Sequence, residues 1–350
     1  MGQLRFPTVT VRIGFFGAGL IARYHASSLV ASGAPAVIHR VYDPDPRRSA
    51  QFAAQWGATA AATEDDVFEG IDAVYICTWT AEHPRLVEAA VARGLAVFCE
   101  KPLAVDLASA QRMTEVVQRA GITNQVGLVL RSTAGFALVA ALVREARAGA
   151  VMSVTFRDDQ QLPFGGYYGS SWRVDRRLAG AGTLLEHSIH NLDLLEWLVG
   201  PVASLGASTG NFHGHPGIED TVAVQLRFRH GGVGVLTSVW HDVPGRLSNR
   251  RLEIFTQHCR IVAEGNVAEA VEWEYESGRA ERCDSPTAQA VELRRLGSTA
   301  PGSADGAFVE AVANHRAATP DFAVALRAHT LADAVYRSAG HGGSAAVITD

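Results

Sequence analysis

The sequence contains little lysine, no run of basic residues and no long apolar run. The absence of each kind of run excludes a class of protein. Of its 31 lysine and arginine residues only Lys101 is a lysine, and 36 acidic residues leave a formal net charge of −5. Because there is no basic run, neither nucleic acid nor an anionic membrane is expected as a partner. No apolar stretch approaches the roughly 18 residues of a spanning helix. The first residues also lack the plan of a signal peptide.

Cysteines are also few, and their spacing fits neither a disulfide framework nor a zinc site. Cys77, Cys99, Cys259 and Cys283 form no CxxC pair, and the first two lie in apolar runs. Such cysteines are typical of reduced, structural thiols. We therefore expect a cytoplasmic protein without a metal site.

The 350 residues, 47% of them hydrophobic, are enough for two domains, since one core stops growing at roughly 250–300 residues. Apolar runs alternate with amphipathic stretches up to about residue 125. This pattern predicts an α/β domain over 1–125, a Rossmann doubly wound parallel sheet. Its expected strands are 9–16, 36–42, 73–78, 96–99 and 123–128.

From residue 126 to 350 the pattern predicts an α+β domain that binds substrate. Helices are expected over 134–148 and 182–198, with a Gly/Tyr-rich loop over 163–171 between them. Several strands then follow with short turns, which indicates a predominantly antiparallel, open sheet. An exposed face on such a sheet favours a homodimer or homotetramer.

A dinucleotide-binding turn is predicted directly after the first strand. Gly17-Ala18-Gly19-Leu20-Ile21-Ala22 matches GxGxxA, whose glycines permit a tight turn and bring the backbone close to a pyrophosphate. Asp43 ends the second strand, where a carboxylate accepts the ribose hydroxyls of NAD and repels a 2′-phosphate. Arg47 and Arg48 follow and would suit NADP. NAD is the preferred cofactor, NADP is the alternative, and a plain turn residue is the alternative for Asp43.

The single lysine lies in Phe98-Cys99-Glu100-Lys101-Pro102, at the carboxyl end of a predicted parallel strand. Open α/β sheets bind ligands just outside such strand ends. Every other basic position uses arginine, so a lysine here favours a compact, tunable ammonium over a permanent guanidinium. Chance placement is the alternative.

Three segments, GFFGAGLIARYH, VFCEKPLA and GAGTLLEHSIHNLDLLEWL, carry a family resemblance. In order and spacing the chain resembles the glucose–fructose oxidoreductase / inositol dehydrogenase / rhizopine-catabolism family (Gfo/Idh/MocA) over essentially its whole length. The resemblance implies NAD(P)-dependent hydride transfer at a secondary hydroxyl or keto group of a sugar, cyclitol or glycoside. It also implies that Lys101 is the catalytic lysine and that its bond to Pro102 can be cis.

A second constellation lies on the predicted helix 182–198. Glu186, His190 and Asp193 are spaced i, i+4 and i+7 and are expected to share one face. By resemblance His190 is the general acid/base. Glu186 is also expected to be catalytic, by orienting the substrate hydroxyls or the imidazole, but it replaces the usual aspartate, which leaves its reach open. A histidine pKa of about 6.5 suits proton transfer, while Lys101 would stabilise charge on the same oxygen. A buried structural histidine is the alternative for His190.

Further positions are assigned by the same resemblance. Thr78 and His83 match the nicotinamide end of the cofactor site, beside Glu100, and Trp79 there either stacks or merely packs. Arg131, Trp172 and Arg173 match family positions near the substrate pocket. His187, where relatives have small or apolar residues, and Tyr168 of the 163–171 loop are also expected to contact the substrate. Carboxylates around the 163–171 loop, Asp158, Asp159 and Asp175, allow an amino-bearing sugar. His213, His215, Glu219 and Asp220 are better explained by a solvated turn than by a metal cluster.

Two other functions fit the same resemblance. A related branch of glycoside hydrolases retains NAD and oxidises its substrate only transiently. A non-catalytic sugar sensor is the third possibility, although the intact set of Lys101, Glu186 and His190 argues against it.

Overall fold

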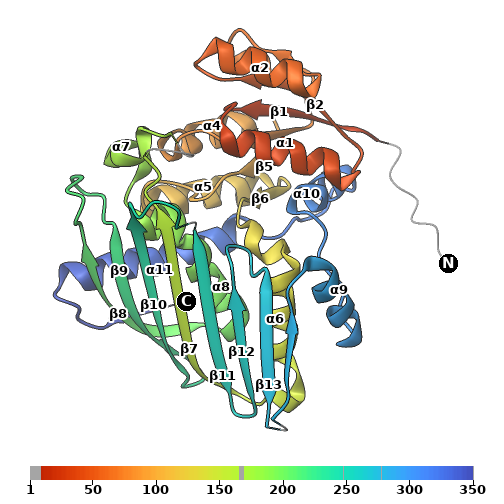
Figure 1. The fold of residues 1–350 in the computed structure, drawn as a ribbon. Coiled ribbons are helices and arrows are strands. Elements are labelled where there is room, and N and C mark those ends of the chain that lie inside the picture. The colour runs from red at the N-terminus through yellow and green to blue at the C-terminus, as the bar shows by residue number, and fades with distance from the viewer. Residues whose placement is uncertain (1–8, 165–168, 247, 277, 350) are drawn as a thin grey trace. The chain divides into compact units, whose positions relative to one another are not determined.

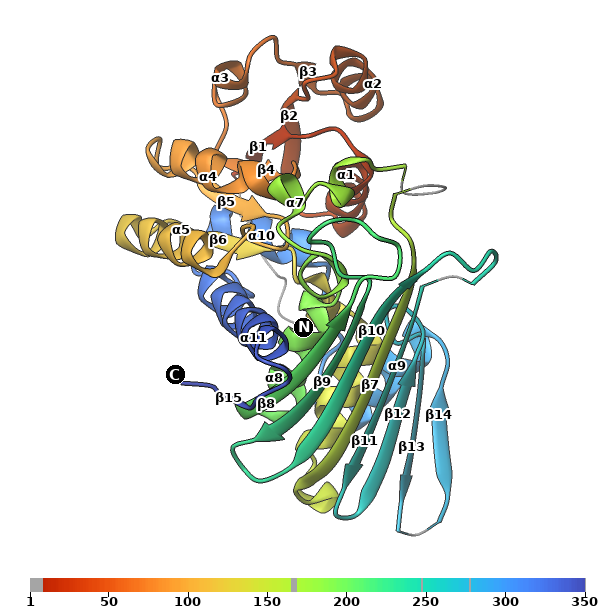
Figure 2. The same cartoon turned by 90° about the vertical axis from the view of Figure 1, so that its left-hand side faces the viewer.

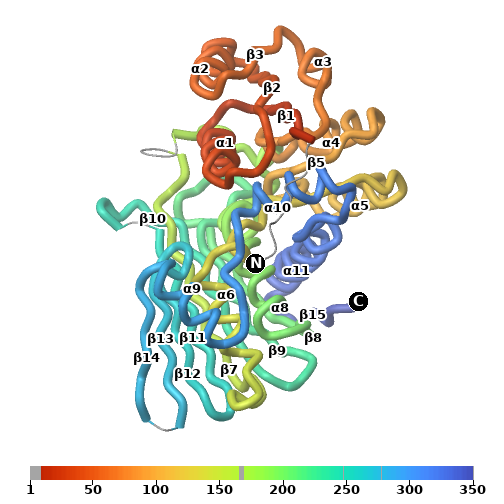
Figure 3. Tube along the Cα trace, turned by 90° about the vertical axis from the view of Figure 1, so that its right-hand side faces the viewer, coloured from red at the N-terminus to blue at the C-terminus, as the bar shows by residue number. Residues whose placement is uncertain are grey.

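The computed structural model describes residues 9–164, 169–246, 248–276 and 278–349 (Figure 1). Its contacts divide the chain into a first unit, residues 1–128 and 302–326, and a second unit, residues 129–301 and 327–350. The predicted boundary near residue 125 did not include the segment 302–326 in the first unit. That segment belongs there because helix α10 (Ala304–Ala313) packs against helix α1 (Leu20–Ser32), as Figure 3 also shows.

The first unit is built on a six-stranded parallel sheet in the order β3-β2-β1-β4-β5-β6. This is the strand order of a Rossmann domain, so the predicted doubly wound sheet is confirmed. The strands are β1 (Val11–Phe16), β2 (Ala36–Tyr42), β3 (Thr59–Ala60), β4 (Ala73–Ile76), β5 (Ala96–Cys99) and β6 (Asn124–Val126). The other helices are α2 (Pro46–Trp56), α3 (Glu64–Val67), η1 (Thr80–Glu82), α4 (His83–Val91) and α5 (Leu107–Ala120).

An aromatic ladder crosses one face of this sheet. Tyr75 stacks between Phe15 and Phe98, with ring centroids 4.8 and 4.5 Å away, and Phe308 of α10 meets both Tyr75 and Phe98 edge-on at 5.6 Å. His25 of α1 lies 4.8 Å from the Phe98 ring. Aromatic pairs of this kind add to the free energy of apolar burial, so α1 and α10 are fixed on the same face of the sheet.

The second unit is built on a nine-stranded sheet in the order β14-β13-β12-β11-β7-β10-β9-β8-β15. Among the strands that the structure describes, only β7 and β10 pair in parallel, so the predominantly antiparallel sheet is also confirmed. The strands are β7 (Val151–Gln161), β8 (Val202–Gly210), β9 (Thr221–Phe228), β10 (Val233–His241), β11 (Asn249–Thr256), β12 (Cys259–Glu264), β13 (Ala270–Tyr275), β14 (Ala280–Cys283) and β15 (Ala346–Val347).

One face of this sheet is covered and the other is open. Buried and exposed residues alternate along β9, as the two-residue period of a strand requires. Helix α6 (Ala134–Arg144) contacts β12 and β13 and packs beside α8 (Ile189–Val199). Figure 2 shows the long strands side by side. The remaining helices are η2 (Val129–Ser132), η3 (Ala146–Ala148), η4 (Trp172–Val174), α7 (Arg176–Ala179), η5 (Thr183–His187), α9 (Pro286–Arg295) and α11 (Phe322–Gly340). The residues of α11 up to Leu326 belong to the first unit, and those from Arg327 belong to the second.

None of the helices in the described ranges combines the length and the apolar character that a bilayer crossing requires.

Candidate functional site

The turn between β1 and α1 has the geometry expected of a phosphate-binding turn. Gly17 has φ +90°, and a Cβ there would lie 2.4 Å from the Cys77 carbonyl oxygen, so only glycine fits. A Cβ on Gly19 would meet no atom of the described residues within 4 Å, so there is free space beside the Gly19 backbone. Gly19 is also the N-cap of α1, and Leu20 and Ile21 of the first turn are exposed. The turn therefore offers the amide-lined approach that a dinucleotide pyrophosphate needs.

Asp43 lies directly after β2 and is held against this turn. One carboxylate oxygen accepts the Ala18 amide proton at 2.9 Å, and the other accepts that of Asp45 at 2.9 Å. Arg47 is exposed in the first turn of α2. The carboxylate thus adjoins the glycine turn, in the place where a ribose-binding acid is expected.

His83 joins the loops that follow β4 and β5. Its Nδ1 lies 3.0 Å from the Pro102 carbonyl oxygen and its Nε2 lies 3.3 Å from that of Thr78. Burial lowers the pKa of His83, despite these hydrogen bonds. The neighbouring Trp79 is 42% exposed. The predicted cofactor contacts of Thr78, Trp79 and His83 stay predictions, but His83 connects the loop after β4, which carries all three, to the loop after β5.

Lys101 lies two residues after the end of β5 and is half-buried, and its peptide bond to Pro102 is cis, as the family resemblance implied. The Lys101 amide donates a 3.2 Å hydrogen bond to the Glu100 carboxylate. Glu100 itself is only 6% exposed. The lysine therefore sits at the carboxyl edge of the parallel sheet, where ligands of such sheets bind.

Behind Lys101 lies a buried cluster of two carboxylates and one histidine. His25 Nε2 lies 2.7 Å from Glu100 Oε1, and His25 Nδ1 lies 2.7 Å from Asp305 Oδ1. Burial alone would lower the pKa of His25, but the hydrogen bonds and charges of the two carboxylates outweigh it and raise the pKa to about 9. The cluster thus holds an imidazolium at neutral pH.

In the second unit the structure corrects the predicted helix over 182–198. Residues Thr183–His187 form a π-helical turn, and α8 begins only after Ser188. The buried Glu219 carboxylate accepts the Gly182 and Leu184 amide protons at 2.7 and 3.0 Å, which caps this turn. The i, i+4 spacing of Glu186 and His190 therefore crosses a junction rather than one continuous α-helix.

The acidic residues of this constellation have separate arginine partners. Glu186 accepts a 2.6 Å hydrogen bond from Arg173, whose guanidinium lies 4.5 Å from the Trp172 ring. Asp193 accepts two from Arg131, at 2.8 and 2.5 Å, and the buried surroundings raise the pKa of Asp193. His190 is buried in the first turn of α8.

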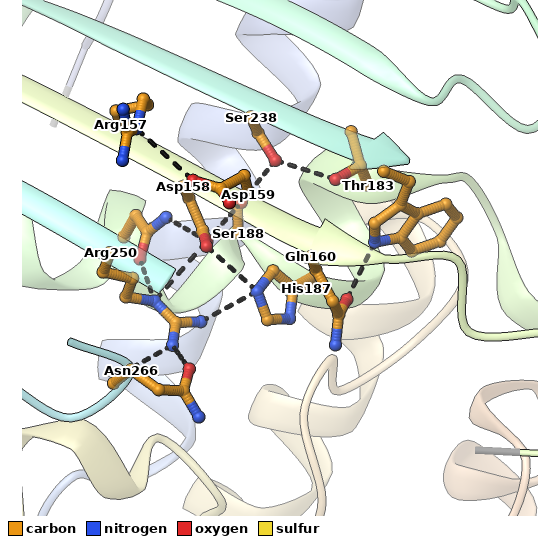
Figure 4. A network of polar contacts seen from close by, with 12 residues as sticks. Arg157, Asp158, Asp159, Gln160, Thr183, His187, Ser188, Ser238, Arg250 and Asn266 are labelled. Atoms are coloured by element: carbon orange, nitrogen blue, oxygen red, sulfur yellow. Dashed lines mark hydrogen bonds and ion pairs between the residues drawn. The ribbon is translucent and has the colours of Figure 1, made fainter. Parts of the chain in front are cut away.

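His187 belongs to a buried polar network centred on Asp158 of β7 (Figure 4). The Asp158 carboxylate lies 3.1 Å from His187 Nε2, and accepts hydrogen bonds from Ser188 at 2.8 Å and Asn191 at 2.6 Å. Arg250 of β11 lies 3.5 Å away. Burial would raise the pKa of Asp158, but His187, Arg250 and these hydrogen bonds hold it well below the usual range. The network fixes the π-helical turn to β7 and β11.

The remaining carboxylates near the 163–171 loop also have partners within the chain. Asp159 accepts hydrogen bonds from Arg246 at 2.7 and 2.9 Å, and Asp175 caps α7 through the Arg177 amide. His213 and Asp220 form a local pair at 2.8 Å. Tyr168 lies outside the described residues.

Sequence reasoning missed His25, Asp305, Asn191 and Arg250. Only His25 carried a signal, since it ends the GFFGAGLIARYH segment. Asp305 is 280 residues from His25, and Arg250 is 63 from His187, so no local pattern joins them.

Together the parallel sheet, the glycine turn and the strand-end lysine define an NAD-binding oxidoreductase with a separate α+β unit. Comparison with known proteins gives the family. Residues 11–128 match the model of the oxidoreductase family with an NAD-binding Rossmann fold, and residues 136–262 match the GFO/IDH/MocA C-terminal domain. The chain belongs to the GFO/IDH/MocA family, its cofactor is NAD, and it is a dehydrogenase.

Relatives and solved structures agree with this assignment. The chain is 29% identical to myo-inositol 2-dehydrogenase of Thermotoga maritima over 269 residues, 74% of this chain and 76% of the relative. A structure of levoglucosan dehydrogenase with NADH matches with a TM-score of 0.85 at 20% identity, covering 98% of this chain and all of the other. The WlbA dehydrogenase of Bordetella pertussis, with NADH and UDP-GlcNAcA, matches at 0.84 and 23%, covering 98% and 99%.

Proposed function

We propose that this protein transfers a hydride between NAD and a secondary hydroxyl or keto group of a sugar, cyclitol or glycoside, with Lys101 and His190 as its catalytic residues. One observation carries the proposal. The only lysine of the chain lies two residues after the end of β5, at the carboxyl edge of the sheet that also carries the glycine turn. A strand-end ammonium beside a dinucleotide turn is suited to an oxygen that gains negative charge.

The roles of the residues follow from their chemistry. Bound NAD would supply the hydride acceptor for the substrate carbon. Lys101 hydrogen-bonds the substrate oxygen and stabilises its developing charge. His190 takes the hydroxyl proton as general base and returns it in the reverse direction. Glu186 is engaged by Arg173 at 2.6 Å, so we assign it a role in holding the π-helical turn and a substrate hydroxyl rather than in proton transfer.

The residues present fit NAD. Gly17 and Gly19 would hold the pyrophosphate, since a side chain at Gly17 would collide with the Cys77 carbonyl and Gly19 leaves open space. Asp43, fixed beside the turn by the Ala18 amide, would accept the ribose hydroxyls and disfavour the 2′-phosphate of NADP. We propose NAD over NADP on this ground.

Substrate candidates come from the proteins that this chain resembles, whose names and titles include myo-inositol, levoglucosan and UDP-GlcNAcA. All three carry secondary hydroxyls. A sugar with a charged amino group loses support, because Asp158, Asp159 and Asp175 already have partners within the chain. The uncharged acetamido group of UDP-GlcNAcA needs no such carboxylate.

The test is NADH formation, measured at 340 nm, with the purified protein, NAD and each of these three compounds. Turnover of one of them supports the proposal, and Lys101→Arg is then expected to lose about 100-fold or more in kcat, because a guanidinium fork does not reproduce one compact donor. Full activity of Lys101→Arg would refute the role of Lys101. Substrate cleavage without net NADH would instead indicate the glycoside hydrolase alternative.

A further inference from the structure

We propose that His25 is a positioning residue: through the Glu100 carboxylate it fixes the backbone of Lys101 and thereby the direction of the ammonium. The inference rests on the proposed function, in which Lys101 contacts the substrate. It concerns three residues, His25, Glu100 and Asp305. Neither the glycine motif nor the chemistry of the lysine itself predicts a positioning role for them.

The geometry forms a chain of hydrogen bonds that ends at Lys101. His25 Nε2 lies 2.7 Å from Glu100 Oε1, and the other oxygen of that carboxylate accepts the Lys101 amide proton at 3.2 Å. Because both acceptors of His25 are carboxylates, both ring nitrogens act as donors. Glu100 therefore receives a charge-assisted hydrogen bond, which is shorter and stronger than a neutral one.

Glu100 has little freedom to leave this position. A Cβ on Gly127 would lie 2.3 Å from Glu100 Oε1, so the carboxylate lies directly against the Gly127 backbone. On the opposite side His25 is held by Asp305 at 2.7 Å and is completely buried. The Phe98 and Tyr75 rings, 4.8 and 5.7 Å from the imidazole, pack against it. The Glu100 carboxylate, which accepts the Lys101 amide proton, is therefore restricted both by the Gly127 backbone and by the His25 imidazole.

The chain allows a direct test, because Lys101 is its only lysine. An amine-acylating reagent such as acetic anhydride finds two amines in this chain, Lys101 and the N-terminal amine, and peptide mass spectrometry separates these two products from each other and from acylation elsewhere. The rate of Lys101 modification reports on the exposure and pKa of this ammonium, without substrate and without turnover.

Two variants distinguish the roles of the two ring nitrogens of His25. In His25→Gln the amide nitrogen takes the place of Nε2 and keeps a donor for Glu100, whereas in His25→Asn it takes the place of Nδ1 and keeps one for Asp305. Both variants remove the same positive charge. They differ in which carboxylate keeps a hydrogen bond, and in the one methylene group by which glutamine is longer than asparagine.

We expect the Lys101 modification rate of His25→Asn to differ from that of His25→Gln by about threefold or more, with His25→Gln nearer the wild type. With an active substrate, kcat of His25→Asn should fall about tenfold or more below that of His25→Gln. The affinity for NAD, measured by calorimetry, should be the same in both. Equal modification rates, or wild-type behaviour in His25→Asn alone, would overturn the proposal.

Gly127→Ala gives an independent check that leaves His25 intact. Its methyl group displaces the Glu100 carboxylate, so the Lys101 modification rate should change as in His25→Asn, and an unchanged rate would count against the proposal. Failure of the proposed function looks different: Lys101→Arg would then turn over normally, whatever the modification rates of the His25 variants.

Discussion

Each unit of this protein contains a buried cluster of ionisable side chains that includes a histidine, and the two clusters are composed in opposite ways. In the first unit two carboxylates, Glu100 and Asp305, share His25. In the second unit one carboxylate, Asp158, is shared by His187 and Arg250. In each cluster the central group, His25 or Asp158, has two partners of the opposite charge type. These partners favour its charged form, so the pKa of His25 is raised and the pKa of Asp158 is lowered.

The difference shows how each unit uses its charge. With His25 protonated, the first cluster contains two negative charges and one positive charge. Its Glu100 carboxylate accepts a hydrogen bond from the Lys101 amide. In the second cluster Arg250 balances Asp158, and the hydrogen bonds of Asp158 go to Ser188 and Asn191 beside the π-helical turn. The first cluster orients a charged residue, whereas the second secures the shape of the main chain.

The largest expected effect comes from removing the centre of the second cluster. Asp158→Ala leaves the Arg250 guanidinium, 3% exposed, without its carboxylate, and we expect a loss of about 3–5 kcal/mol in the free energy of unfolding. Asp158→Asn keeps the shape and one acceptor and should cost less. Urea unfolding followed by circular dichroism measures both variants. A loss below about 1 kcal/mol for Asp158→Ala would mean that the network is not structurally important.

The second prediction uses the opposite pH responses of the two clusters. The folded-state pKa of His25 is raised from 6.5 to about 9, so its stabilisation is fully present below pH 6.5 and is lost as pH rises through 9. The loss is at most about 3.5 kcal/mol, since one pKa unit corresponds to about 1.4 kcal/mol. The Asp158 stabilisation is lost in acid instead, because its pKa is lowered.

Unfolding free energies of the wild type and His25→Gln between pH 6 and 10 measure this effect. Buried Cys77 and Cys99, whose pKa values burial raises, also weaken the fold in alkali, but they do so in both proteins. The difference between the two proteins should therefore shrink as pH rises from 6.5 to beyond 9. A constant difference would contradict a protonated His25.

What the sequence could and could not predict follows from the range of the interactions involved. The strands β4 and β5 were predictable because a strand covered on both faces is apolar throughout, and Lys101 stood out because every other basic residue is arginine. The π-helical turn was not predictable, since Leu184, Leu185 and Ile189 repeat as in an ordinary α-helix. The partners of His25 and His187 come from distant segments that only the folded sheets bring together.

The smallest expected effect comes from an exposed pair that serves as the reference for both clusters. Arg337 and Asp333 form an i, i+4 ion pair at 2.8 Å on α11, with side chains 58% and 37% exposed. Water already solvates both charges, so Arg337→Ala should cost about 0.5 kcal/mol or less, and added salt should remove the effect. Urea unfolding at low and high salt, with Asp158→Ala alongside, makes the comparison. If the buried substitution proved as sensitive to salt as the exposed one, solvent would have to reach Asp158, and the second cluster would no longer count as an interior network.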